Sequence, residues 1–433
     1  MSGDIPGMGA VFWPVGTGDS STIVVSEEIV MQVDLHDMSK ADDDENPEVP
    51  VVDRLVAALP QVNGRPYLAV FALTHADKDH CLGFADLLDK VDVGELWATP
   101  RLWREYEETD GDGLCEDAQA FQVESERRVA AVMAAVGAGR EPATGDRILV
   151  IGYDTDHDKH AYDELPEEYK SGPGKSITAL DGYDCSNRFE AFIHAPFADD
   201  CAAARNETSL AMQVRLTDDS GQEGRLLLFG DLAHDTIVKI IDYSEYHKRE
   251  RYLTWDVLLA PHHCSKKVMY LPNGDGRDVL QLDVINAFRR HGGNQSAVVS
   301  SSGVIPTTDS PGANPPHRKA ANRYAEIADE FICTMAWPNT STPFPVVFTV
   351  DAHGARIVQQ ETVKLAARET RTKSGPRLFG HRLAAVTAAA SLADDSAGVQ
   401  EVAGATGPER VRHAIVADRG GDKAPGTAVG FGQ

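Results

Sequence analysis

Short apolar runs broken by glycine and polar residues open the chain. Residues 9–15, 21–26 and 28–34 are rich in β-branched side chains, and glycines and serines separate the first two. Runs of this length and composition are typical of strands. The pattern therefore predicts three consecutive short strands, arranged as a meander.

Helical and strand periods alternate in the next segment. Residues 50–60 carry apolar positions at helical spacing and stop at a proline. Residues 67–75 form a continuous apolar run of strand length, which indicates a strand buried on both faces. Residues 81–91 return to helical spacing, and residues 94–100 resemble the next strand. The polar residues between the buried strand and the helix are therefore predicted to lie on a loop.

The remainder divides into an irregular middle, a second set of strands and a tail. Within residues 101–184 we expect an insertion that contains a helix over 115–139, a strand over 145–152 and a polar segment over 157–176. Further strands are predicted at 189–196, 208–217, 225–231, 255–263, 296–303 and 343–351. Residues 368–433 are rich in Ala and Gly, and we expect a mostly disordered tail, apart from a helical pattern at 379–393. The predicted organisation is one domain over residues 1–367 followed by this tail.

Charge and composition narrow the class of protein. The 433 residues include 41 basic and 67 acidic side chains, a net charge of −26. A surface this negative repels polyanions, so extended duplex DNA is an unexpected partner. No apolar run approaches the ~18 residues of a membrane span, and the six cysteines are scattered without C-x-x-C spacing. We therefore expect a cytoplasmic protein with reduced thiols and no membrane partner.

Four metal-ligand side chains are crowded into the loop after the buried strand. The segment reads THADKDH over residues 74–80, and it places His75, Asp77, Asp79 and His80 within six positions. His75 with Asp77 can serve one cation, and Asp79 with His80 a second. Imidazole and carboxylate mixtures suit Zn²⁺, and a set richer in carboxylates also suits Mn²⁺ or Fe. Taken alone, the same spacing also fits a solvated loop.

Two later strand ends favour the metal interpretation. One predicted strand ends in Gly-Asp, which presents Asp231, and the next ends in Pro-His-His, which presents His262 and His263. A lone aspartate there could cap a helix, and a histidine pair could belong to a surface turn. Three strand ends that all finish in metal-ligand residues are unexpected by chance. The sequence therefore predicts a site for two divalent metal ions, with Zn²⁺ favoured over Mn²⁺.

These motifs occur in the order of a known family. The sequence resembles the metallo-β-lactamase superfamily from Val11 to Tyr324, and within it the soluble hydrolase domain of ComEC-type competence proteins. The matching segments are PVGTGDSSTIVV, VMQVDLH, THADKDH, NETSLAMQVRL, LLLFGD, LLAPHHCS and the pattern VVSSSG…NPPH.

The resemblance implies an α/β fold, the metallo-β-lactamase-like αβ/βα four-layer sandwich, with metals at the edge between two sheets. It implies that Asp231 bridges two metal ions and that His262 or His263 completes the second site, His262 being preferred. It implies that Asp34 braces the ligand loop and that Asp19 lies near the site. The resemblance also implies that Asn314 and His317 lie at the site.

Several residues depart from the family's pattern. Asp77 stands where most members carry a second histidine, and Asn206 or Ser209 stands near the place of another ligand. The resemblance then implies a first metal site that is weak or holds Mn²⁺. His194 is an alternative ligand, although a strand histidine without that role is the simpler interpretation. Cys264 replaces a glycine of the family, and we expect a packing role for it.

Hydrolysis is the chemistry that such a site predicts. A metal-bound water has its pKa lowered toward ~7 and can attack as hydroxide at neutral pH. We expect a phosphodiesterase or nuclease that acts on a nucleotide or a short single-stranded nucleic acid. The predicted catalytic residues are Asp79, Asn314, His317 as the acid for the leaving oxygen, and Lys266 as a cation for the phosphate. Hydrolysis of a lactone, lactam or thioester is the first alternative, and a metal-bound scaffold or sensor within a larger assembly is the second.

Overall fold

The computed structural model describes most of the chain outside the tail. The described residues are 5–38, 49–109, 113–153, 160–198 and 205–358. The predicted tail over 368–433 and the helical pattern within it lie outside these residues, so both stay predictions.

A large mixed sheet is built mainly from the first half of the described chain. Its strand order is β21-β20-β1-β2-β3-β5-β6-β7-β8, and β4 pairs with β5. The N-terminal meander β1 to β3 is antiparallel, as predicted, and β3, β5, β6, β7 and β8 run parallel to one another. The strands span β1 (Gly9–Phe12), β2 (Ser21–Val24), β3 (Val30–Val33), β4 (Gln61–Val62), β5 (Arg65–Ala72), β6 (Asp92–Ala98), β7 (Arg147–Ile151), β8 (Lys170–Ser171), β20 (Val346–Asp351) and β21 (Gly354–Ile357).

A second mixed sheet follows from the second half. Its order is β19-β18-β15-β14-β13-β12-β9. Strands β12, β13 and β14 are antiparallel neighbours, and β14, β15, β18 and β19 are parallel. Parallel neighbours end at the same edge of a sheet, so the segments after β14, β15 and β18 emerge together. The strands span β9 (Ser176–Ile177), β12 (Phe189–Ala195), β13 (Ala211–Thr217), β14 (Glu223–Leu228), β15 (Trp255–Leu259), β18 (Gly292–Ser300) and β19 (Glu330–Cys333).

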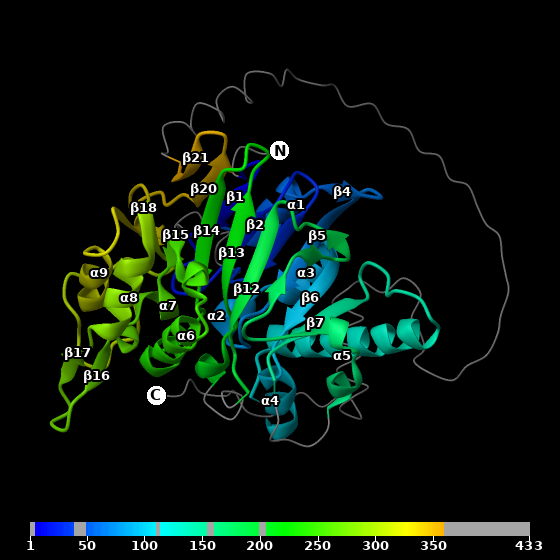
Figure 1. Cartoon of the computed structure of the whole chain (residues 1–433), viewed down its shortest axis with the longest axis horizontal. Helices are drawn as coiled ribbons and strands as arrows, with labels where there is room; N and C mark the ends of the chain where they lie inside the picture. Colours follow the sequence, from blue (N-terminus) through cyan, green and yellow to red (C-terminus); the bar gives the residue numbers. More distant parts are fainter. Residues whose placement is uncertain (1–4, 39–48, 110–112, 154–159, 199–204, 359–433) are drawn as a thin grey trace.

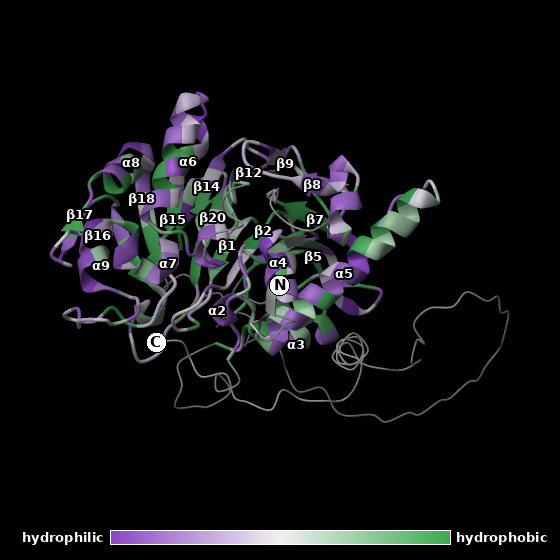
Figure 2. Ribbon diagram, turned by 90° about the horizontal axis from the view of Figure 1, so that it is seen from below, coloured by the Kyte–Doolittle hydropathy of each residue, from purple (hydrophilic) through white to green (hydrophobic). Residues whose placement is uncertain are grey.

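Helices cover the outer face of each sheet. The helices on the first sheet are α1 (Val51–Ala58), α3 (Phe84–Lys90) and α5 (Glu116–Gly137), and those on the second are α6 (His234–Tyr246), α8 (Asp283–His291) and α9 (Arg318–Tyr324) (Figure 1). Helices α6, α8 and α9 were not predicted. Figure 2 shows apolar residues gathered along the central strands and polar residues on the helices around them.

Alternating side chains divide the interior into three apolar cores. On β14 and just after it, Leu226 and Leu228 point to the core shared by both sheets, whereas Leu227 and Phe229 pack under the helices of the second sheet. A third core lies between the first sheet and its helices. This period of two is expected for strands buried on both faces. The predicted αβ/βα four-layer sandwich is confirmed.

The middle region that the sequence predicts as an insertion supplies part of the first sheet. It contains α4 (Arg101–Thr109), α5, and strands β7 and β8, and β7 pairs in parallel with β6. The buried Arg128 guanidinium fastens α5 to this sheet by donating to the carbonyls of Val93 and Gly94 at 2.9 and 3.0 Å. Glu124 accepts from the same guanidinium at 2.8 Å, so the buried charge is paired.

The remaining described elements are small. Two hairpins are formed by β10 (Ala179–Leu180) with β11 (Tyr183–Asp184) and by β16 (Tyr270–Pro272) with β17 (Asp278–Leu280). Among the described residues, every helix is too short or too polar to cross a bilayer.

The packing of β15 gives a direct test of the four-layer arrangement. Leu258 is fully buried in the core beneath α6, α8 and α9. We expect Leu258→Ala to lower the free energy of unfolding by about 2–5 kcal/mol, because it leaves a cavity in a packed core. Val279→Ala, at a position 43% exposed on the β16–β17 hairpin, should change it by less than about 0.5 kcal/mol. Urea denaturation compares the two variants, and equal losses would contradict this packing.

Candidate metal centre

The predicted ligand segments converge where strands of both sheets end. Asp34 follows β3, His75 follows β5, and Asp231 follows β14. Of the remaining candidate ligands, Asp77 directly precedes α2 (Lys78–Cys81), Asp79 and His80 lie on α2, and His262 and His263 lie on the short segment α7 (Pro261–Cys264). Labels α2 and α7 are neighbours in both views (Figures 1 and 2). The loop after β5 thereby meets the strand ends of the second sheet.

The carboxylate of Asp231 is the centre of the cluster, with imidazoles near both of its oxygens. Its Oδ1 lies 3.3 Å from Nε2 of His80 and 3.3 Å from Nε2 of His263. Its Oδ2 lies 3.6 Å from Nε2 of His262 and 4.0 Å from Nε2 of His75. One carboxylate therefore has two histidine-lined sides, and the neighbouring histidines His262 and His263 face different oxygens.

Hydrogen bonds behind two of the rings decide which nitrogen faces the cluster. His80 Nδ1 lies 2.8 Å from Asp34 Oδ2, and Asp34 also accepts from the backbone N–H and the hydroxyl of Thr74, each at 2.7 Å. His263 Nδ1 donates to the carbonyl of Ser301 at 3.0 Å. With Nδ1 protonated in each ring, Nε2 keeps its lone pair and points it toward Asp231. Such outer hydrogen bonds are the usual means of orienting metal-binding histidines.

The donor set fits a divalent cation. Ligand atoms of Asp19, His80, Asp231 and His263 all lie within 4.8 Å of one another, and all four residues are buried. The Nε2 atoms of His80 and His263 are 3.2 Å apart, and both lie 3.3 Å from Asp231 Oδ1. Asp231 Oδ1 and His75 Nε2 are buried without a hydrogen-bond partner among the described residues. A cation next to Asp231 Oδ1 would give the first group of four residues a shared partner, and His75 Nε2 faces the other oxygen.

Two further aspartates of the loop extend the cluster on opposite sides. Asp79 Oδ2 lies 3.3 Å from His263 Nε2, and this side chain is 36% exposed. Asp77 Oδ2 lies 3.4 Å from His75 Nε2, while its Oδ1 accepts from Arg205. Asp79 therefore lies at the open edge of the cluster, and Asp77 already has a cationic partner.

The pKa values reflect this crowding of opposite charges. Burial alone lowers the pKa of His80 and of His263, but the surrounding carboxylates, Asp231 foremost, raise both well above the ordinary value. Burial alone raises the pKa of Asp231, and the charges of His263 and His80 bring it well below its ordinary value. Asp231 is therefore ionised in the folded protein, and protons compete with a metal ion for the two rings.

Burial and neighbouring charges also shift the pKa values of Asp77, Asp79 and His262. For Asp77, burial raises the pKa, but His75 and Arg205 lower it to about 2. The pKa of Asp79 is also lowered, because His263 and His80 outweigh its burial. Burial lowers the pKa of His262, so this ring is neutral at pH 7.

The turn that carries His262 and His263 has a strained backbone. His262, His263 and Cys264 all have left-handed φ values of 51°, 51° and 66°. Each non-glycine residue in this region costs about 1–2 kcal/mol. The His262 N–H donates to the Gly230 carbonyl at 2.9 Å, and the His317 N–H donates to the Cys264 carbonyl at 3.1 Å. These bonds hold the turn and aim both rings at Asp231.

Cys264 occupies a position where a glycine would be free of this strain. Its side chain is fully buried, and burial raises the pKa of its thiol far above the ordinary value. The thiol is therefore protonated and packs in the core beneath α9, as the sequence predicts.

The candidate catalytic residues beyond Asp79 lie away from Asp231. His317 uses both ring nitrogens on the backbone: Nδ1 accepts from the Lys266 N–H at 3.2 Å, and Nε2 lies 3.1 Å from the Ala313 carbonyl. The Lys266 ammonium pairs with Asp278 at 2.7 Å. Asn314 is exposed. No contact among the described residues joins these three side chains to the histidine cluster, so their catalytic roles stay predictions.

Asn206, Ser209 and His194, which the sequence indicates near the place of another ligand, divide into two groups. Asn206 Nδ2 donates to Asp231 Oδ2 at 3.1 Å, and Ser209 Oγ lies 3.2 Å from His75 Nδ1. Both therefore support cluster residues. His194 instead bonds the Tyr252 carbonyl through Nε2 at 2.9 Å and packs against Phe192. His194 is thus a hydrogen-bonded strand histidine outside the cluster.

Two residues at the site were not singled out from the sequence. His36 is buried beside the cluster, and its Nδ1 would be 2.1 Å from a Cβ at Gly18, so only glycine fits there. Arg205 is the second, and it pairs with Asp77 and Glu105. The position of His36 two residues after Asp34 was an available signal. Arg205 directly precedes Asn206, so its position next to a segment already expected at the site was an available signal.

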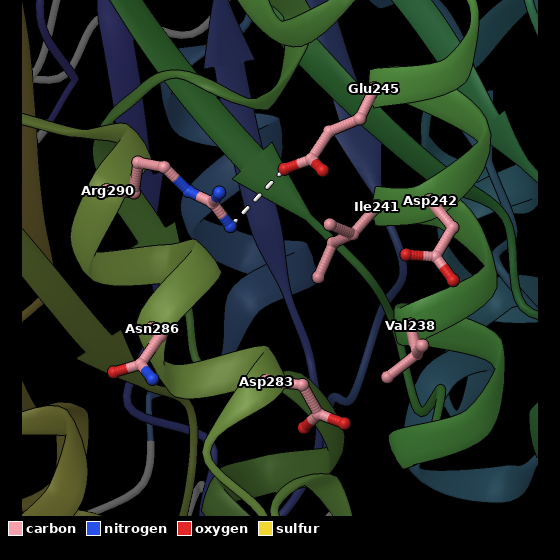
Figure 3. A pocket seen from close by; sticks show the side chains of 7 residues that line it. All are labelled: Val238, Ile241, Asp242, Glu245, Asp283, Asn286 and Arg290. Atoms are coloured by element: carbon pink, nitrogen blue, oxygen red, sulfur yellow. Dashed lines mark ion pairs between the residues drawn. The ribbon is translucent and has the colours of Figure 1, made fainter.

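A separate hollow lies on the outer layer, between α6 and α8. It is lined by Val238, Ile241, Asp242, Glu245, Asp283, Asn286 and Arg290 (Figure 3). Arg290 and Glu245 pair across it at 3.3 Å. None of the cluster residues lines this hollow.

Comparisons with known proteins give matches among solved structures. No family model matches the chain, and no curated protein matches it. Zn²⁺-bound PqqB from Methylobacterium extorquens is 12% identical, with a TM-score of 0.33 over 66% of this chain and 77% of that one. The metallo-β-lactamase MIM-1 from Novosphingobium pentaromativorans is 14% identical, with a TM-score of 0.27 over 59% and 74%.

A third match comes from an archaeon. It is ST1585 from Sulfolobus tokodaii, a metallo-β-lactamase superfamily protein, at 11% identity and a TM-score of 0.24 over 96% of this chain and 100% of that one. These solved structures belong to the superfamily that the motifs resemble. The assignment of the fold depends on the sheets and cores described above.

Asp34 allows a test of the outer hydrogen bonds. It has a φ of 55°, and asparagine tolerates this region, so Asp34→Asn should fold normally. The amide provides a weaker acceptor for His80, and we expect zinc affinity to fall about 10- to 100-fold. Competition with a chromogenic chelator measures the affinity. Asp53→Asn, at an exposed aspartate paired with Lys90, is the control and should leave zinc affinity unchanged.

The raised pKa values of His80 and His263 predict opposite pH trends with and without metal. Their protonated forms stabilise the metal-free fold below about pH 6.5, the unfolded value, and this contribution is lost as pH rises through the raised folded values. Metal binding strengthens over the same range, because fewer protons compete. The difference in Tm between zinc-loaded and EDTA-treated protein should therefore widen as pH rises. Thermal unfolding at several pH values measures both Tm values. A Tm difference that stays constant or narrows as pH rises would contradict this prediction.

Proposed function

We propose that this protein is a metal-dependent hydrolase of the metallo-β-lactamase superfamily, and that it cleaves phosphodiester bonds in a nucleotide or a short single-stranded nucleic acid. The observation that carries the proposal is the buried Asp231 carboxylate with histidines on both oxygens. Unpartnered buried atoms of His75 and Asp231 point to a cation at the same place.

The residues divide into two sets around Asp231. On one side, His80 and His263 would hold a metal ion together with Asp231 Oδ1, with Asp19 and Asp79 next to them. On the other side, His75 and His262 adjoin Asp231 Oδ2, and Asp77 adjoins His75. A metal ion bound here would supply a hydroxide at neutral pH by lowering the pKa of a coordinated water. The set around Asp231 Oδ1, with His80 and His263, is the more complete, so we expect it to bind a metal ion more tightly than the set around Oδ2.

The protein's own groups around the cluster are suited to handling a proton. Asp79 is ionised and lies at the open edge, so its carboxylate can accept a hydrogen bond from an attacking water. His262 is neutral because burial lowers its pKa, and it can accept a proton when the weaker set around Asp231 Oδ2 holds no metal ion. These two groups are better placed for proton transfer than His317, whose ring nitrogens are engaged by the backbone.

Charge near the cluster supports an anionic substrate of small size. Lys78 and Lys267 are exposed, and their charges help to lower the pKa of His36 and of His262, respectively. These lysines are better placed for a phosphate than Lys266, which Asp278 neutralises. The net charge of −26 opposes long polyanions, which favours a short substrate over duplex DNA.

Hydrolysis of bis(p-nitrophenyl) phosphate, with Zn²⁺ and Mn²⁺ supplied separately, tests the proposal. We expect turnover by the native protein and a loss of at least about 100-fold in kcat/KM for His263→Ala, which removes a ligand and its Asp79 contact. His353→Ala, at an exposed turn between β20 and β21, should keep full activity.

The outcomes of this assay separate the substrate classes. Activity confined to a lactone or to nitrocefin would reject the phosphodiesterase proposal and keep the hydrolase. Metal binding without turnover of any of these substrates would favour a metal-bound scaffold or sensor. A lack of metal binding by the native protein would overturn the metal centre itself.

A further inference from the structure

Two thiols from distant parts of the sequence meet directly behind residues 74–80, the segment that carries His75, Asp79 and His80 and is called the metal loop below. Cys81 Sγ lies 3.4 Å from Cys115 Sγ, although the residues are 34 positions apart. A disulfide bond is about 2.05 Å long, so an approach of about 1.4 Å closes it. Both cysteines are free, and Cys81 comes directly after the candidate ligand His80.

The backbone around the pair is fastened on both sides. The carboxylate of Asp117, in the first turn of α5, accepts from the N–H groups of Gly83 and Ala85 at 3.0 and 2.9 Å. These bonds join the start of α5 to the turn that links α2 with α3. The two thiols are thus held in contact by the fold.

The two thiols differ in a way that assigns their order of reaction. Cys115 is partly exposed at the start of the 22-residue helix α5, whereas Cys81 is fully buried. The hydrogen bond from Cys81 and the N–H groups at the helix start lower the pKa of Cys115, which favours its thiolate. A small oxidant therefore reaches Cys115 first, and Cys81 is placed to react second.

We propose that Cys81 and Cys115 form a reversible disulfide when the protein meets a hydroperoxide, and that this bond is a redox switch on the metal loop. The formation of the disulfide does not depend on the proposed hydrolase activity. Its effect on metal binding does rest on the candidate metal centre.

The chemistry balances with hydrogen peroxide as the oxidant. The Cys115 thiolate attacks one peroxide oxygen, the O–O bond breaks, and Cys115 becomes a sulfenic acid as hydroxide leaves. The Cys81 sulfur then attacks the Cys115 sulfur, the S–S bond forms, and water is released after the Cys81 proton is taken up. Two thiols lose two electrons in total, and one peroxide is reduced to two waters. A dithiol reductant reverses the change by thiol–disulfide exchange.

Closing this bond changes the segment that carries the ligands. The Cys81 Sγ lies 3.2 Å from the Asp77 carbonyl and 3.4 Å from Cys115 Sγ, so its single S–H donates to one or the other, and oxidation removes this donor. The Asp117 bonds hold the start of α3, so the movement falls on α2, which contains Asp79 and His80. We therefore expect the oxidised protein to bind zinc more weakly, by about 10-fold or more, as in other losses of ligand support.

Peptide mapping of the full chain tests the disulfide. The protein is treated with hydrogen peroxide, its free thiols are alkylated after denaturation, and the digest is analysed by mass spectrometry with and without dithiothreitol. We expect a Cys81–Cys115 cross-linked peptide that dithiothreitol removes. Cys115→Ser should yield no cross-link at Cys81, and Cys185→Ser, at a buried cysteine outside the pair, should leave the cross-link intact.

Two results would overturn the proposal. If Cys115 is oxidised to sulfinic acid while Cys81 remains fully alkylated, the pair does not close. If the cross-link forms but zinc affinity is equal in the oxidised and reduced proteins, the bond is not a switch. Peroxide should also leave the zinc affinity of Cys115→Ser unchanged, and far-UV circular dichroism checks that this variant folds.

Discussion

The buried Asp231 carboxylate is the interaction on which the rest of this site depends. An ionised carboxylate removed from water loses several kcal/mol of solvation unless cations or hydrogen bonds replace the water. Here the compensation comes from the charges of His263 and His80, which approach Asp231 from the turn after β15 and the loop after β5, and from the Asn206 amide, which donates to Oδ2. The two sheets are therefore joined at their ends by an electrostatic contact, in addition to the apolar core between them.

Backbone strain is concentrated at the same place. Asp34, His262, His263 and Cys264 all adopt left-handed conformations without being glycine. Such residues persist where the surrounding structure holds them, and they cluster at functional sites. At this site, Asp34 orients His80 and the strained turn orients His263, so the strain positions both rings that face Asp231 Oδ1.

The metal loop is also connected to the helical layer over the first sheet. Arg205 pairs with Asp77 and donates to the Gly113 carbonyl at 2.8 Å, and Asp117 binds the turn after α2. The Cys81–Cys115 contact lies between these two connections. Short polar contacts thus join the start of α5 to the segment that carries Asp77, Asp79 and His80. This arrangement explains how a covalent change outside the cluster could alter metal binding.

Much of the fold and of the candidate ligand cluster was predictable from the sequence, because local periodicity and residue type carry that information. Strands buried on both faces produce continuous apolar runs, and the ligands follow those runs directly, so His75, Asp231 and His263 were found without coordinates. Helices α6, α8 and α9 were missed.

Only the tertiary structure decided how those residues share the site. It placed His262 and His263 on opposite oxygens of Asp231, because three successive left-handed residues separate their directions. It turned Lys266 toward Asp278, and brought Arg205 to Asp77 and Cys115 to Cys81. Contacts of this kind depend on how distant segments pack against one another, and no local pattern of residues encodes them.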